Sequence, residues 1–145
     1  MLELAASRGL SNGQLGPAGP DPFVERRAAG LRGETFAYWY LRRHGYTIIA
    51  RNYRISGIHG EIDMIGYDGE VLAFVEVKTR TGENPALPED AVNADKRRYL
   101  SRMARQFLTE RRIHEARCRF DVVAIQARPG RRPDVRLHKG AFAYR

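Results

Sequence analysis

The stretch GEIDMIGYDGEVLAFVEVK, residues 60–78, predicts two antiparallel strands joined by a tight turn. Asp68-Gly69 is a strong signal for a two-residue hairpin loop, and with that loop Asp63 pairs with Phe74. Side chains alternate along a strand, and directly paired residues share a face. Because the second strand is apolar on both sides of Glu76, we expect it to be covered on both faces of the sheet.

Four charged side chains lie on one face of this predicted hairpin, at its open end: Glu61, Asp63, Glu76 and Lys78. A three-residue loop would instead send Glu76 to the opposite face. Two carboxylates about 4.5 Å apart repel by roughly 3–4 kcal/mol at an effective dielectric near 20, so one takes up a proton or a cation bridges them. An oxygen-only pair suits Mg²⁺ or Mn²⁺. Lys78 is placed to hold an attacking water or the charge that develops on phosphorus, which predicts metal-assisted phosphodiester hydrolysis.

The alternative interpretation of Glu76-Val77-Lys78 is a pair of solvated partners on an exposed strand, which is common. Charges inside an apolar run that is covered on both faces are rarely tolerated without a function. Lysine is also scarce, because 22 of the 25 basic residues are Arg. We therefore favour the functional interpretation of Asp63, Glu76 and Lys78.

Composition and charge narrow the class of protein. The 145 residues suffice for one domain, and the single cysteine, Cys118, excludes an internal disulfide and suits a reducing cytoplasm. No apolar run approaches the roughly 20 residues that span a bilayer, so no membrane partner is expected. Residues 1–95 carry net −3 and residues 96–145 net +11. A basic half beside an acidic pocket suits a nucleic acid, although an Arg-rich solvated surface would have the same composition.

Apolar periodicity and turn signals predict an α/β fold with a mixed central sheet flanked by helices. Residues 1–22 are rich in Gly, Pro and Ser and are expected to form a flexible tail, followed by one domain over 23–145. A loop over 82–88 either gates the site or only connects elements. The expected helices and strands are helix 22–43, strands 46–52, 61–66 and 71–79, helix 91–112, and strands 120–126 and 134–138.

Both predicted helices carry charged residues of interest. Glu34 shares a stripe with Ala37 and Leu41, so it either completes the metal site or pairs with Arg42 or Arg43. Lys96 lies on the apolar side of the second helix, where it reaches the catalytic edge or a phosphate, or extends past the core to solvent. The candidate nucleic-acid contacts are Arg80, Lys96, Arg98, Arg102 and Arg105, with Arg112 on the same helix face.

An ordered set of motifs resembles a known family. The motifs are Gly33-Glu34-x-x-Ala37, Asn52-Tyr53-Arg54, Gly60-Glu61-Ile62-Asp63-x-Ile65, Phe74-Val75-Glu76-Val77-Lys78-x-Arg80, Lys96 and Arg119-Phe120-Asp121. From about Leu31 to about His138 the chain resembles the bacterial YraN-type family of the PD-(D/E)xK restriction-endonuclease-like superfamily. Ile62 stands where the superfamily's name has proline, and that proline is commonly missing.

The resemblance implies a three-layer α/β core, relatedness to archaeal Holliday-junction resolvases, and nuclease chemistry that depends on Mg²⁺ or Mn²⁺. Asp63, Glu76 and the Val77 carbonyl would hold the metal, Lys78 would position the attacking water, and Glu34 would assist. The expected substrate is DNA rather than RNA, and branched DNA would favour a symmetric homodimer. The rival hypothesis is a non-catalytic nucleic-acid-binding module on the same fold.

Overall fold

The computed structural model describes residues 19, 21–81 and 92–143. The predicted tail, apart from residues 19, 21 and 22, and the predicted loop over 82–88 lie outside these residues. Neither helix in the described ranges combines the length and apolar character that a bilayer-spanning segment requires. In chain order the elements are α2 (Pro22–Arg43), β1 (Tyr46–Tyr53), β2 (Ile62–Asp68), β3 (Val71–Thr81), α3 (Ala94–Glu110), β4 (Arg117–Ala127) and β5 (Asp134–Phe142).

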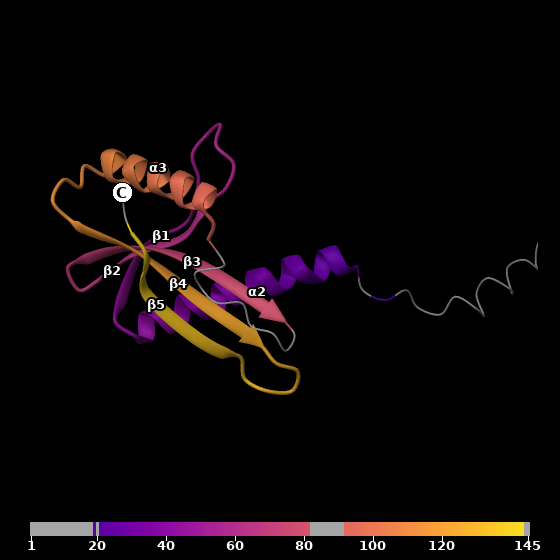
Figure 1. The fold of residues 1–145 in the computed structure, drawn as a ribbon. Helices are drawn as coiled ribbons and strands as arrows, with labels where there is room; N and C mark the ends of the chain where they lie inside the picture. Colours follow the sequence, from indigo (N-terminus) through magenta and orange to yellow (C-terminus); the bar gives the residue numbers. More distant parts are fainter. Residues whose placement is uncertain (1–18, 20, 82–91, 144–145) are drawn as a thin grey trace, which may run out of the picture.

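The five strands form one mixed sheet in the order β1-β2-β3-β4-β5 (Figure 1). Strands β3 and β4 are parallel, and every other neighbouring pair is antiparallel. A parallel pair needs a crossover connection, and α3 lies within the segment that links β3 to β4. The predicted α/β class with a mixed central sheet is therefore confirmed.

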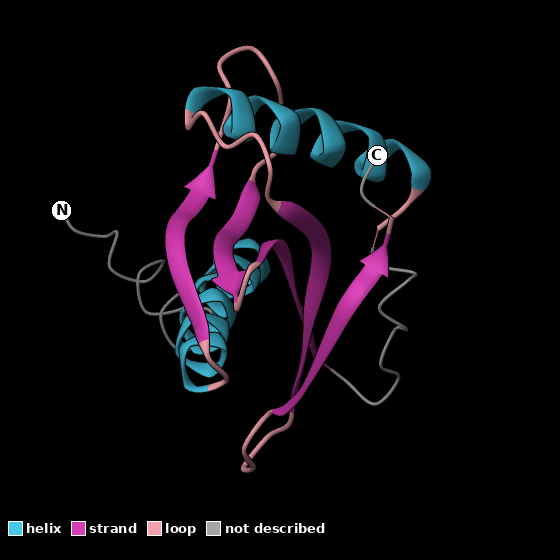
Figure 2. Ribbon diagram, turned by 90° about the vertical axis from the view of Figure 1, so that its left-hand side faces the viewer, coloured by secondary structure: helices cyan, strands magenta, loops and turns pink. Residues whose placement is uncertain are grey.

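The two helices cover opposite faces of the sheet, so the described part of the chain has three layers (Figure 2). On one face, Met103 and Phe107 of α3 pack with Phe74 and Phe120. On the other face, Leu41 of α2 packs in a second apolar cluster that includes Val75 and Val123. Strand β3 is thus buried on both sides, as its apolar run predicts.

The predicted turn between β2 and β3 is wrong by one residue. Asp68 pairs with Val71, so the loop is Gly69-Glu70, and Gly69 has the positive φ of 62° that the first position of a type II′ turn requires. Phe74 consequently pairs with Ile65 instead of Asp63. Because this shift moves the register by two residues, side chains keep their face, and the predicted grouping of Asp63 with Glu76 survives.

Several element ends differ from prediction. Helix α3 begins after Asn93, whose side chain caps it by accepting from the Lys96 N–H, and it ends at Glu110. Arg112 lies beyond the helix with φ 54°, so it is not part of the predicted basic face. Strand β5 continues to Phe142 because the aromatic ring stacks on Phe120, with centroids 4.5 Å apart.

Candidate carboxylate and lysine site

The candidate site lies where β2 and β3 separate. The backbone pairing between these strands ends at Met64 and Val75. Beyond this pair, the Val77 N–H donates to the Asp63 side chain at 2.7 Å. Ile62 remains paired with Tyr53 of β1, while Glu76 remains paired with Val122 of β4. The sheet therefore opens at this end and leaves Asp63 and Glu76 at the fork.

Asp63 and Glu76 are both buried, with 8% and 6% of their surfaces exposed. Burial, together with the charge of Glu76, raises the pKa of Asp63 to about 8, although the Val77 N–H opposes the shift. The Asp63 carboxyl also lies within hydrogen-bonding reach of Glu76. The two predicted carboxylates thus share one desolvated pocket, where a proton or a cation is needed to hold them together.

Two lysines converge on one oxygen of Glu76. Lys78 Nζ lies 3.3 Å from Glu76 Oε2, and Lys96 Nζ contacts the same atom. Burial lowers the pKa of Lys78, and the neighbouring Lys96 ammonium adds to this effect. Burial also opposes the charge on Lys96, but its hydrogen bond to Glu76 and the charge of Glu76 raise its pKa. Of the two positions considered for Lys96, the structure shows the one that reaches the predicted site, at Glu76.

Glu34 reaches the fork from the opposite side of the sheet. Helix α2 approaches β3 closely at Gly33, where a Cβ would lie 2.0 Å from Thr79 Oγ1. The next residue, Glu34, accepts a hydrogen bond from Asn52 Nδ2 at 2.8 Å. Ligand oxygens of Glu34, Glu61 and Asp63 all lie within 4.8 Å of one another. The partner of Glu34 among these contacts is therefore Asn52, and neither arginine considered from the sequence.

Glu61 and its neighbours extend this group, which we call the carboxylate fork: Glu34, Glu61, Asp63 and Glu76. Asn52 Nδ2 donates to Glu61 at 3.1 Å, so one amide bridges two acids. Asn52 has φ 52°, a left-handed conformation that asparagine tolerates better than most residues. Arg54 forms an ion pair with Glu61 at 2.7 Å. The sequence predicted the face of Glu61, but its partners Asn52 and Arg54 were not identified.

Helix α3 supplies a second residue beside the fork. Tyr99 lies one turn after Lys96, and its ring lies against the backbone of Gly60, since a Cβ there would be 2.8 Å from the ring. Burial raises the pKa of Tyr99, Lys96 lowers it, and the charges of the fork raise it again. Sequence reasoning missed Tyr99, although its i, i+3 spacing from Lys96 placed both on one helix face.

The other predicted contacts lie outside this pocket. Arg80, near the end of β3, is exposed, and so are the three predicted arginines of α3, Arg98, Arg102 and Arg105. Val77 meets the fork through its N–H, while its carbonyl remains a predicted metal ligand.

A second polar group, here called the ionic cluster, lies at the other end of β2: Tyr46, Asp68, Arg119, Asp121 and Lys139. Asp121 is fully buried. Its carboxylate accepts hydrogen bonds from Arg119 Nε at 2.7 Å, from the Tyr46 hydroxyl at 2.7 Å and from the Gly140 N–H at 2.9 Å. Arg119 also donates to Asp68 at 2.7 Å. Hydrogen bonds from Arg119 and Lys139 lower the pKa of Asp68. Each acid here meets a cation, which is typical of a structural cluster.

Comparison with known proteins places the chain among similar sequences. The model of the uncharacterised protein family UPF0102 matches residues 33–125, well over half of the chain and including the whole carboxylate fork. A UPF0102 protein from Koribacter versatilis is 44% identical over 119 residues, which cover 81% of each chain. Another, from Symbiobacterium thermophilum, is 46% identical over 116 residues, covering 80% of this chain and 97% of the relative. The names of these relatives state no activity.

Proposed function

The chain belongs to the uncharacterised protein family UPF0102, and we propose that it is a divalent-metal-dependent nuclease that hydrolyses phosphodiester bonds in DNA. One observation carries the proposal. The buried Asp63 carboxyl lies among Glu34, Glu61 and Glu76 where β2 and β3 separate, and two lysines contact Glu76. Such a group is costly to bury unless it serves a cation.

Membership of the PD-(D/E)xK superfamily is part of the same proposal. It is supported by the mixed sheet between two helices and by Asp63 and Glu76-x-Lys78 on neighbouring strands. The strands separate next to these residues, so Asp63 and Glu76 lie where β2 and β3 part, and the Val77 N–H holds the Asp63 side chain in place. A rigid scaffold with reactive groups at its edge suits catalysis by positioning.

The donor set fits a hard divalent cation. All four members of the fork offer carboxylate oxygens, which Mg²⁺ and Mn²⁺ prefer over nitrogen or sulfur ligands. Asp63 and Glu76 are the proposed protein ligands together with the Val77 carbonyl, and Glu34 and Glu61 add negative charge within reach of Asp63. When bound, the metal would polarise the scissile phosphate and lower the pKa of a coordinated water.

The chain's own residues prepare this pocket. The Val77 N–H fixes the Asp63 carboxylate, and Asn52 holds Glu34 and Glu61 side by side. Lys96 contacts Glu76 from α3 and orients its side chain. Lys78, half-buried and close to Glu76, is proposed to hold the attacking water and to stabilise the charge on the phosphate oxygens.

A panel of linear, flapped and four-way DNA substrates with Mg²⁺ or Mn²⁺ tests the proposal. Wild-type protein should cleave at least one substrate, and Asp63→Asn should not. The matched control is Glu70→Gln, which removes an exposed carboxylate from the turn of the same hairpin and should leave cleavage unchanged. If wild type binds DNA but cuts no substrate with either metal, the nuclease proposal fails and a nucleic-acid-binding module replaces it.

A further inference from the structure

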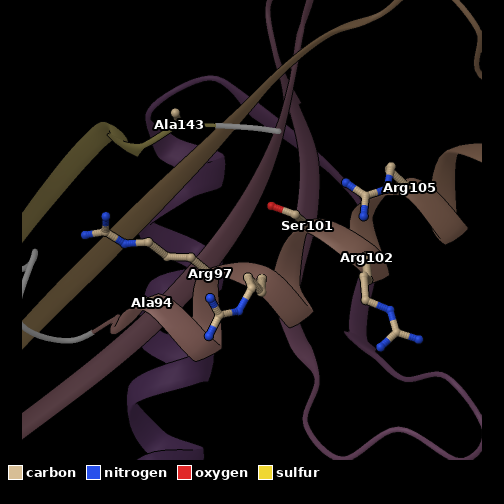
Figure 3. A pocket seen from close by; sticks show the side chains of 7 residues that line it. Ala94, Arg97, Ser101, Arg102, Arg105 and Ala143 are labelled. Atoms are coloured by element: carbon tan, nitrogen blue, oxygen red, sulfur yellow. The ribbon is translucent and has the colours of Figure 1, made fainter.

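A groove lined by arginines runs along α3, outside the carboxylate fork. Its volume is about 470 Å³, and Ala143, just after β5, lines it together with residues of the helix. Figure 3 shows the guanidinium of Arg97 toward one end of this groove and those of Arg102 and Arg105 toward the other end. This α3 groove is lined by Ala94, Arg97, Arg98, Ser101, Arg102, Arg105 and Ala143.

The α3 groove is strongly positive. Four of its seven lining residues are arginines, whose guanidinium groups keep their charge at any physiological pH, and none of the lining residues is a carboxylate. Arg98 pairs with Asp95, but both side chains are exposed, so this ion pair is weak and easily exchanged. Arg97 stacks over Phe142 at 5.4 Å and donates to the Val92 carbonyl, which fixes its stem and leaves its terminal nitrogens to other partners.

The length of the groove indicates the size of the anion. Arg97 and Arg105 are eight residues apart, which is about 12 Å along a helix. Guanidinium groups spread over this length cannot all meet one phosphate. A nucleic-acid strand carries roughly one charge per 3.4 Å of duplex axis, so about three phosphates match the row. Arginine is also the side chain best suited to contact phosphate with two parallel hydrogen bonds.

The groove and the fork share helix α3. Lys96 of its first turn contacts Glu76 in the fork, and Arg97 of the same turn lines the groove. We propose that the α3 groove binds the sugar–phosphate backbone of a polynucleotide whose neighbouring segment lies at the fork. The substrate is then a nucleic acid of several nucleotides rather than a small phosphodiester, an inference that rests on the proposed nuclease function.

Binding and hydrolysis are measured separately to test this inference. The variant Arg98→Gln/Arg102→Gln removes two exposed charges from α3 and keeps good helix-forming residues. Its control is Arg42→Gln/Arg43→Gln, which removes two exposed charges from α2 on the other face of the sheet. Affinity for a labelled DNA duplex is measured by fluorescence anisotropy in EDTA over a range of salt. Hydrolysis of bis(p-nitrophenyl) phosphate with Mn²⁺ is measured beside it.

The groove variant should bind duplex roughly tenfold or more weakly than wild type, and its log–log salt dependence should flatten by about 1.8, or 0.9 per lost contact. The α2 control should match wild type, and both variants should hydrolyse the small diester at the wild-type rate. Equal affinity and salt dependence of the groove variant and wild type would overturn the inference, as would a wild type that does not bind the duplex. Loss of duplex binding in a protein that hydrolyses nothing would instead refute the nuclease proposal and leave the groove assigned.

Discussion

The two ends of strand β2 hold buried carboxylates in opposite electrostatic surroundings. In the ionic cluster, fully buried Asp121 meets the guanidinium of Arg119 and the hydroxyl of Tyr46. In the carboxylate fork, buried Asp63 meets a backbone N–H of Val77 and faces Glu76 and Glu34. Asp121 of β4 and Asp63 of β2 are both buried, so the difference lies in the charges that surround each acid.

This difference separates a structural role from a functional one. A buried carboxylate with its own cation and hydrogen bonds is stable as an ion. A buried carboxylate among other carboxylates is stable only when protonated or when an external cation arrives. Lys78 and Lys96 contact Glu76, and Arg54 pairs with Glu61, so these cations meet other acids of the fork and not Asp63. We interpret the ionic cluster as support for the fold and the fork as the reactive end.

The largest expected effect is a loss of stability when a substitution breaks the ionic cluster. Arg119→Met leaves Asp121 buried without its main cation, so the free energy of unfolding should fall by about 3–5 kcal/mol. Urea unfolding followed by circular dichroism measures this change. Arg117→Met, on an exposed position of the same strand, should change stability little. If the two variants are equally stable, the cluster does not support the fold.

The next effect concerns catalysis at the fork. Lys78→Ala should lower single-turnover cleavage by a factor on the order of 10² or more, because it removes a group that stabilises the transition state. Folding and DNA affinity should change little, since one charge among 25 basic residues is lost. Lys139→Ala, the equivalent change in the ionic cluster, should cut at the wild-type rate. Wild-type cleavage by the Lys78 variant would refute the catalytic assignment.

A pH series distinguishes the two ends of β2 through stability. The pKa of folded Asp63 is raised to about 8 from 3.8, so the folded state holds this proton more tightly than the unfolded chain. Stability from this group is therefore present at low pH and is lost as the pH rises from about 4 to about 8. In EDTA, Asp63→Asn should become more stable relative to wild type by on the order of 2 kcal/mol between about pH 5 and pH 8.

The compared quantity is the difference in the free energy of unfolding between Asp63→Asn and wild type. The titration of the four histidines is common to both proteins and cancels in this difference. Added Mg²⁺ should remove most of the difference by stabilising the charged wild type. A difference that does not change with pH would show that Asp63 is charged at neutral pH without a metal.

The smallest expected effect is at Asp68, which lies at the edge of the ionic cluster. Its side chain is 21% exposed and contacts Arg119 at 2.7 Å and Lys139 at 2.9 Å. Solvent screens these contacts, so Asp68→Asn should cost only about 0.5–1 kcal/mol at neutral pH. Because the pKa of Asp68 is lowered, this stabilisation disappears as the pH falls below the unfolded value of 3.8. Chemical unfolding at two pH values checks it, and a neutral-pH loss as large as that of Arg119→Met would contradict the screening.

Side-chain parity carried most of the successful prediction. Alternation along the strands placed Asp63, Glu76 and Lys78 on one face, and the structure brings Asp63 and Glu76 together there with Lys78 beside them. The turn was misplaced because Asp68-Gly69 is a strong local hairpin signal. In the structure Asp68 is instead a strand residue held by Arg119 and Lys139, a contact between residues far apart in the chain.

The unpredicted parts of the site depend on long-range contacts of the same kind. The bridge from Asn52 to Glu34 and Glu61 joins a helix, a strand end and a loop, and no local period indicates it. The motif residues Asn52 and Arg54 were visible in the sequence, but without the fold their partners could not be assigned. Likewise, periodicity placed Lys96 on the inner face of its helix, and only the packing of α3 shows that it reaches Glu76.

Calorimetric titration with Mn²⁺ tests the central claim most directly, namely that the carboxylates of the fork bind a cation through Asp63. Wild-type protein should show one main site, Asp63→Asn should lose it, and Asp68→Asn, from the balanced end of the same strand, should keep it. Equal Mn²⁺ binding by wild type and Asp63→Asn would contradict the account, because the charge left open at Asp63 would then have no part in holding the metal.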